Sequence, residues 1–263
     1  MPPDLLLKYH PFQPQKSGDG LIYRQVHPHI SLQPYIYCFW EMKSIGILVK
    51  PISFNVIADG CSDLVIRLKG KRPNMIVGFS QESASFPMGL EARCFGIRFL
   101  PAGFTSLFGI TACELTDRVE LLDDVLPDFN AFIRNRIDEN TPSEAVFSLL
   151  NEFLRKRVSN FLRTETRIIK ALNNILSSSF TSLPIETGIS SKHERRLFEE
   201  WVGDSPKVFE KIARFQQFID MSINGIETDL PWVECGYYDQ SHLIKDFKLM
   251  AGDTPKAFIK AIK

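Results

Sequence analysis

The pattern of apolar and polar residues divides the chain into a β-rich first part and a helical last part. Short apolar or alternating runs recur within the first 125 residues, at 52–58, 63–68, 75–79 and 94–99. Turn-forming pairs such as Asp59 and Gly60 separate these runs. Short strands at regular spacing with turns between them are typical of a small barrel or a sandwich. We therefore predict a mostly-β barrel over residues 1–125.

The period of the apolar positions changes after residue 125. Val146, Phe147, Leu150 and Leu154 recur at helical spacing. Basic residues 155–157 follow near the end of this run, where the helix dipole favours positive charge. We predict a helical connector over residues 126–160. It either packs on the barrel or serves dimerisation, and the sequence leaves both alternatives open.

Residues 161–263 read as all-α and contain an internal repeat. Residues 198–209 are FEEWVGDSPKVF, and residues 247–258 are FKLMAGDTPKAF. Phe, Gly, Asp, Pro, Lys and Phe recur at matched positions, and Ser in the first copy corresponds to Thr in the second. A self-similar segment of this kind indicates that one helical unit occurs twice.

Each copy of the repeat follows a glycine and a residue that can cap a helix. Gly188 and Gly236 would form the tight turn between two helices. Ser190 and Asp239 would then cap the second helix through their side-chain oxygens. The glycine of the repeat ends this helix, and its proline begins another. The sequence therefore predicts two helix-turn-helix units joined by a long helix.

Polar side chains on the outer faces of the two capped helices are the candidate DNA contacts. A recognition helix meets base edges with its N-terminal residues. Glutamine can pair with adenine, and lysine or arginine can reach guanine or a phosphate. The candidates are Lys192, His193, Arg195 and Arg196 in the first unit, and Gln240, Ser241, Lys245 and Lys248 in the second.

The charge balance counts against a DNA-binding protein. The chain has 31 basic and 31 acidic residues, and the two signs also cancel from residue 161 onward. A DNA-binding domain usually carries a basic excess. The DNA-binding interpretation therefore requires that the basic side chains gather on one face.

The remaining composition points to a cytoplasmic protein. No apolar run reaches the roughly 18 residues of a membrane span, and the first residues do not resemble a secretory signal. The five cysteines are widely spaced and form no C-x-x-C pair, so we expect buried, reduced thiols rather than a zinc cluster.

Residues 235–258 resemble the second helix-turn-helix of AraC/XylS-type transcriptional regulators. The run from Gly188 to Phe215 is similar to the first unit and the linker helix of that family. The resemblance implies two helix-turn-helix subdomains over 161–263 that enter successive major grooves. It matches Lys192, Arg195 and Arg196, and also Gln240, Ser241 and Lys245, to contact positions.

Three residues depart from the family pattern. Glu194 stands where members usually have an apolar residue, and it is expected on the core face of its helix. Pro184 and Trp232 stand where a small residue is usual. These departures affect the expected geometry of the helices that support the two recognition helices, and with it the expected strength of DNA binding.

The first part resembles a cupin-like sensor domain of unassigned ligand. The resemblance rests on the motifs around Trp40, Asp59 to Leu64, Phe95 to Gly103 and Glu114 to Asp117. It implies an effector or dimerisation domain and names no ligand. The expected partners are double-stranded DNA, a small-molecule effector, RNA polymerase and a second copy of the chain, with no membrane.

Two patterns of the first part suggest an enzyme. His27 and His29 have a spacing that some metal sites use, but His10 is the only other histidine of the first part, and no acidic residue follows at a telling interval. Cys61 lies between Asp59 and Asp63, and neighbouring carboxylates would raise the pKa of its thiol. We expect a DNA-binding regulator, with no enzymatic activity and no cofactor. The alternatives are a small-molecule-binding or metal-dependent barrel enzyme with a degenerate helical domain, and a regulator that acts by protein contact.

Overall fold

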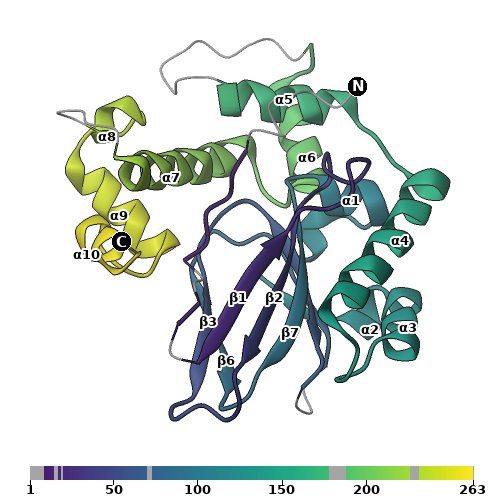
Figure 1. Ribbon diagram of the computed structural model, residues 1–263. Helices are drawn as coiled ribbons and strands as arrows, with labels where there is room; N and C mark the ends of the chain where they lie inside the picture. The colour runs from purple at the N-terminus through teal and green to yellow at the C-terminus, as the bar shows by residue number, and fades with distance from the viewer. Residues whose placement is uncertain are drawn as a thin grey trace.

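The computed structural model describes residues 9–14, 17–18, 20–69, 73–177, 188–225 and 231–262. The strands come first along the chain and most of the helices follow (Figure 1). This order confirms the predicted α+β class, with a β-rich first part and an all-α last part. No helix within the described ranges is long and apolar enough to cross a membrane.

The strands form two antiparallel sheets. Their bounds are β1 (Leu21–Val26), β2 (Ile36–Ser44), β3 (Ile52–Val56), β4 (Ser62–Arg67), β5 (Met75–Val77), β6 (Ala84–Gly89), β7 (Arg93–Phe99) and β8 (Val119–Leu121). The larger sheet has the order β1-β2-β7-β4-β5-β8, and β3 pairs with β6 in a sheet of two strands.

The sheets do not close into the predicted barrel. Within the described part of the chain, no ladder joins the β3–β6 pair to the larger sheet. The two layers meet instead through side chains, and Trp40 of β2 stacks on Phe54 of β3 with ring centroids 5.2 Å apart. Alternation along a strand predicts its two faces but not its neighbour, so the sequence could not separate a barrel from this arrangement.

Helices cover the other face of the large sheet. They are α1 (Gly103–Phe108), the 3₁₀ helix η2 (Ala112–Glu114), α2 (Leu122–Val125), α3 (Pro127–Arg136) and α4 (Ser143–Phe161). Phe95 and Ile97 of β7 share a buried core with Val146 and Leu150 of α4. The connector helix therefore packs on the sheet, which is the first of the two alternatives that the sequence left open. The domain boundaries at residues 125 and 160 stay predictions.

The last part consists of helices only. They are α5 (Thr166–Ser177), α6 (Ser191–Trp201), α7 (Pro206–Asn224), α8 (Pro231–Glu234), α9 (Gln240–Met250) and α10 (Pro255–Ile262). Ile57 and Phe79 of the first part belong to the same buried core as Phe198, Phe209 and Phe247. The helical part is thus docked on the loops at one end of the sheets, above and to the left of the upper ends of the strands in Figure 1.

Candidate nucleic-acid interface

The two predicted capped helices are present at the predicted places. The Ser190 side chain accepts a hydrogen bond from the backbone N–H of His193 at 3.4 Å, at the start of α6. The Asp239 side chain accepts from the N–H of His242 at 2.8 Å, at the start of α9. Both caps satisfy a backbone donor that the first turn of a helix leaves unpaired. The turn glycines Gly188 and Gly236 have φ angles of 74° and 77°, which favour glycine.

A single long helix connects the two units. Helix α7 begins at Pro206, where a missing N–H costs no hydrogen bond, and contains 19 residues. At ~1.5 Å per residue it is roughly 28 Å long. Phe209, Ile212, Phe215 and Ile219 form its fully buried face. A helix of this length can hold two recognition helices about one DNA turn, ~34 Å, apart.

Helix α6 exposes three cations. Lys192, Arg195 and Arg196 are exposed, and His193 is half-buried. Arg195 donates to Glu199 at 2.7 Å, one helical turn further along. These side chains line a surface hollow of about 450 Å³, which lies on the outer side of the helix, away from buried Leu197 and Trp201.

Helix α9 exposes the four candidates that the sequence named. Gln240, Ser241, Lys245 and Lys248 are exposed, whereas Leu243, Phe247 and Met250 are buried. The acidic residue of this stretch, Asp246, is only 4% exposed. Burial removes its carboxylate from the outer face, so the two lysines dominate that face although the whole chain is neutral.

Sequence reasoning missed three features of the second unit. Asp246 is buried, with its Oδ2 atom 3.7 Å from Nε2 of His242. Tyr238 is 92% exposed immediately before α9, and Ile244 is 38% exposed on the helix. The repeat could have pointed to Asp246, because the matched position of the first unit is the apolar Leu197.

The residues that depart from the family pattern have different outcomes. Glu194 was expected on the core face of its helix, but it is only half-buried. Its carboxylate therefore keeps access to water. Trp232 lies in α8 and packs half-buried against the shared core. Pro184 lies outside the described residues.

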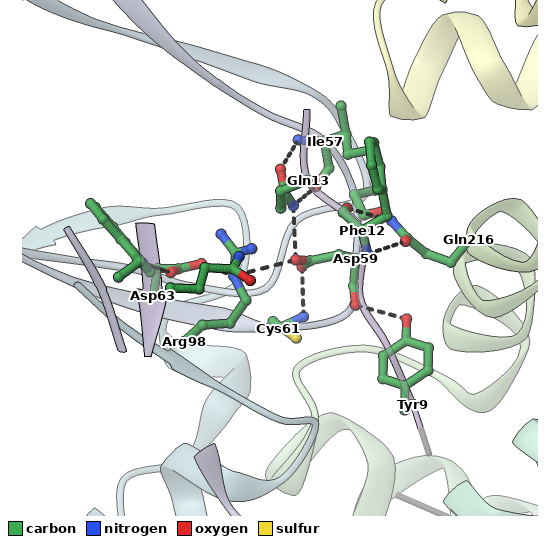
Figure 2. A network of polar contacts seen from close by, with 12 residues as sticks. Tyr9, Phe12, Gln13, Ile57, Asp59, Cys61, Asp63, Arg98 and Gln216 are labelled. Atoms are coloured by element: carbon green, nitrogen blue, oxygen red, sulfur yellow. Dashed lines mark hydrogen bonds and ion pairs between the residues drawn. The ribbon is translucent and has the colours of Figure 1, made fainter. Parts of the chain in front are cut away.

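The residues that suggested a nucleophile belong to a buried polar network (Figure 2). Nε of Arg98 donates to Oδ2 of Asp63 at 3.0 Å, and Gln13 donates to Oδ2 of Asp59 at 2.8 Å. Burial raises the pKa of the Cys61 thiol, and Asp59 adds to that shift. A thiol with a raised pKa is mostly protonated, so this network does not activate a nucleophile.

The residues that suggested a metal site do not converge. Within the ranges that the structure describes, no group of three His, Cys, Asp or Glu side chains is placed to hold a metal ion. Nδ1 of His29 lies 2.9 Å from the Ser31 hydroxyl, and the His10 ring contacts Tyr37 edge-on, with ring centroids 6.2 Å apart.

Four of the five cysteines are buried as expected, but Cys113 is exposed.

The space between the two sheets is small. Aromatic and methionine side chains, together with Asp63 and Arg67, enclose a cavity of about 20 Å³. That volume suits one water molecule. An effector bound between the two sheets would therefore have to separate the β3–β6 pair from the larger sheet.

Comparisons with known proteins find a family model for the β-rich part and structures of similar fold. A model of a domain of unknown function (DUF6597) matches residues 24–120, from β1 to β8. The chain is similar to ToxT from Vibrio cholerae O395 bound to (E)-4-(8-methylnaphthalen-1-yl)but-3-enoic acid, with 11% identity, 80% of this chain and 90% of ToxT covered, and a TM-score of 0.41. It is also similar to an apo ToxT variant from V. cholerae strain SCE256, with 10% identity, 95% and 100% covered, and a TM-score of 0.39. No curated protein sequence matches.

Proposed function

We propose that the chain is a sequence-specific DNA-binding transcription regulator of AraC/XylS type that acts without catalysis. The observation that carries the proposal is the duplicated segment. Its two copies lie at the ends of α6 and α9, and both helices have a side-chain cap at the start, a glycine just after the end and a proline that begins the next helix. Two equal helical units joined by one rigid helix suit a duplex, which offers its major groove twice on one side.

The exposed side chains divide into candidates for base contacts and candidates for phosphate contacts. In the proposed complex, Gln240 and Ser241 at the first turn of α9 and Lys245 one turn later meet base edges. Lys248 stands near the end of the helix and contacts a phosphate. Arg196 of α6 occupies the position that corresponds to Lys245 and would take the same role in the first unit.

The proposal includes regulation by a small-molecule effector, which would bind in the β-rich part. The cavity between the sheets accepts about one water as it stands. An effector that enters this cavity would thus bind together with a movement of β3 and β6. Contacts with RNA polymerase and with a second copy of the chain stay predictions, as does the cytoplasmic location.

Selection from a random-sequence DNA pool by the full-length protein tests the proposed function. We expect enrichment of two short blocks with centres about 10 base pairs apart. Lys245→Ala should lower affinity for the selected duplex, while Lys50→Ala removes the same charge from an exposed loop of the β-rich part and should not. No enrichment at low salt, or equal loss in both variants, would refute the proposal.

A further inference from the structure

The loop between β5 and β6 touches the first helix-turn-helix unit just after α6. Nε2 of Gln81 donates to Oδ2 of Asp204 at 2.9 Å. A Cβ atom built on Gly203 would lie 2.9 Å from Cβ of Phe79, so the two backbones are in close contact. The hydroxyl of Thr116, which lies after η2, donates to the carbonyl of Gly203 at 2.6 Å.

The same loop touches the second unit at the end of α9. The backbone N–H of Ser83 donates to the carbonyl of Leu249 at 3.1 Å. The backbone N–H of Ala58, in the loop between β3 and β4, donates to the carbonyl of Met250 at 3.0 Å. A Cβ atom built on Gly252 would lie 3.0 Å from Oγ of Ser83. The last carbonyls of a helix lack partners within it, so these N–H groups complete the end of α9.

Both contacts fall on equivalent positions of the repeat. Gly203 and Gly252 are matched residues in the two copies. Residues 79–83, here called the splint, therefore touch the same point of each unit. Four residue steps span at most about 14 Å, so the splint holds the two turns close together. Its own base is fixed, because the N–H of Asp117 donates to the carbonyl of Phe79 at 2.8 Å.

A buried amide of the connecting helix strengthens the docking of the two parts. Gln216 of α7 is 3% exposed. Its Oε1 atom accepts from the N–H of Phe12 at 2.8 Å (Figure 2). Its Nε2 atom donates to the carbonyl of Ala58 at 2.7 Å. Separation of the two parts would leave these buried groups without partners until water reached them. The connecting helix and the end of α9 are thus both held by Ala58, in the loop between β3 and β4.

We propose that the splint fixes the placement of α6 relative to α9 and so determines the spacing between the two DNA blocks that the protein recognises. This inference rests on the proposed function. The splint contacts the C-terminal ends of both units, and Lys192, Arg196, Ser241 and Lys245 remain exposed. The docked arrangement therefore leaves the outer faces open to a duplex.

A designed cross-link tests whether the docked arrangement binds DNA. The Cβ of Ser83 lies 4.0 Å from a Cβ built on Gly252, within the range of a disulfide, about 3.5–4.5 Å. Ser83→Cys with Gly252→Cys, in a Cys113→Ser background, should cross-link on oxidation with diamide. The oxidised protein should bind the selected duplex within about threefold of the reduced protein. Each single cysteine variant controls for strain, because φ of Gly252 is 76°.

A charge pair tests the role in spacing. Gln81→Glu places a carboxylate against Asp204 and should loosen the splint, and the further change Asp204→Asn should restore the contact. Binding is measured on the selected duplex and on duplexes with one or two base pairs inserted between the blocks. We expect wild type to lose at least about tenfold on insertion, Gln81→Glu to lose much less, and the double variant to behave like wild type. Gln25→Glu, on an exposed strand position, is the matched control.

Three results would overturn the role of the splint. These are failure of the cross-link to form, loss of DNA binding on oxidation that reduction restores, or unchanged spacing preference in Gln81→Glu while hydrogen exchange at Ala58 and Ser83 accelerates. Failure of the proposed function gives a different result, because no form of the protein would then bind the selected DNA. Cross-link formation needs no DNA, so it reports on docking separately.

Discussion

Helices α6 and α9 occupy matched positions of the repeat, 49 residues apart, and they resemble each other most where they are buried. Phe198 corresponds to Phe247, and Trp201 corresponds to Met250. All four are 5% exposed or less. His193 and His242 also correspond, and each donates its backbone N–H to the cap. The shared features are those that a helix needs to start, to pack and to end.

Each of the two helices has one acidic residue on its inner side, but at different positions. The first unit has Glu194 and Leu197, and the second has Leu243 and Asp246 at the matched positions. Glu194 is half-buried, whereas Asp246 is almost fully buried. Either unit therefore accommodates one acidic residue near its core. In the second unit the carboxylate of Asp246 is buried, so it adds no negative charge to the outer face.

The outer faces differ more strongly. Arg195 pairs with Glu199 in the first unit, and the matched residues of the second unit are Ile244 and Lys248. Arg196 and Lys245 are the one basic position that both helices share among their candidate contacts. We infer that the second unit contributes more of the electrostatic attraction to DNA, and that the shared basic position provides readout in both.

Loss of the matched core aromatic residues should have the largest effect. Phe198→Ala and Phe247→Ala should each lower the free energy of unfolding by about 3–5 kcal/mol, because each leaves a cavity in the shared core. Phe247 should lie at the upper end, since its ring contacts Phe215, Phe218 and Phe258 at 4.7, 5.4 and 6.0 Å between centroids. Urea unfolding measures both. A cost below about 1 kcal/mol for either variant would contradict equivalent packing.

The shared basic position should have the next largest effect. Arg196→Ala and Lys245→Ala should each weaken binding to the selected duplex by about 1–3 kcal/mol and relax the preference at one base position. Affinities for a panel of single-base variants of the duplex measure this. Equal weakening on every sequence would instead make that side chain a phosphate contact.

The caps should have a smaller effect that differs between the units. Asp239→Ala should lower the free energy of unfolding by about 1 kcal/mol, because α9 loses the acceptor for a first-turn N–H. Ser190→Ala should cost less, since its cap hydrogen bond is longer, 3.4 Å against 2.8 Å. Thermal unfolding at matched pH compares the two, and a larger cost for Ser190→Ala would reverse the ranking.

Replacement of one charged residue by its counterpart from the other unit should have the smallest effect. Glu199→Lys copies the residue of the second unit into the first and releases Arg195. We expect affinity to rise by roughly threefold at low salt and the salt dependence to steepen by about one counterion. Lys248→Glu should do the opposite. Titrations at several salt concentrations measure the slope, and an unchanged slope in both variants would place this position away from the duplex.

Local pattern predicted much of this structure. Both caps, both turn glycines and the glycine ends lie where the repeat placed them. The strands at 52–56, 62–67, 75–77 and 93–99 closely follow the predicted runs. These features depend on neighbours within a few residues, which the sequence displays directly.

Long-range features were not predictable in the same way. The separate β3–β6 pair and the docking of Ala58 and Ser83 on α9 each depend on segments far apart in the chain. Exposure of Cys113 is a further case, because a thiol carries no local signal of its surroundings. The candidate contacts could be named from the sequence, but the splint that joins the two units could not.

Hydroxyl-radical footprinting of the full-length protein on the selected duplex tests the central claim most directly. We expect two protected patches on one side of the helix, with centres about one turn apart. Arg196→Ala should weaken only the patch under α6, and Lys245→Ala only the patch under α9. A single patch that both substitutions weaken equally, or no protection at low salt, would contradict recognition by two matched helices.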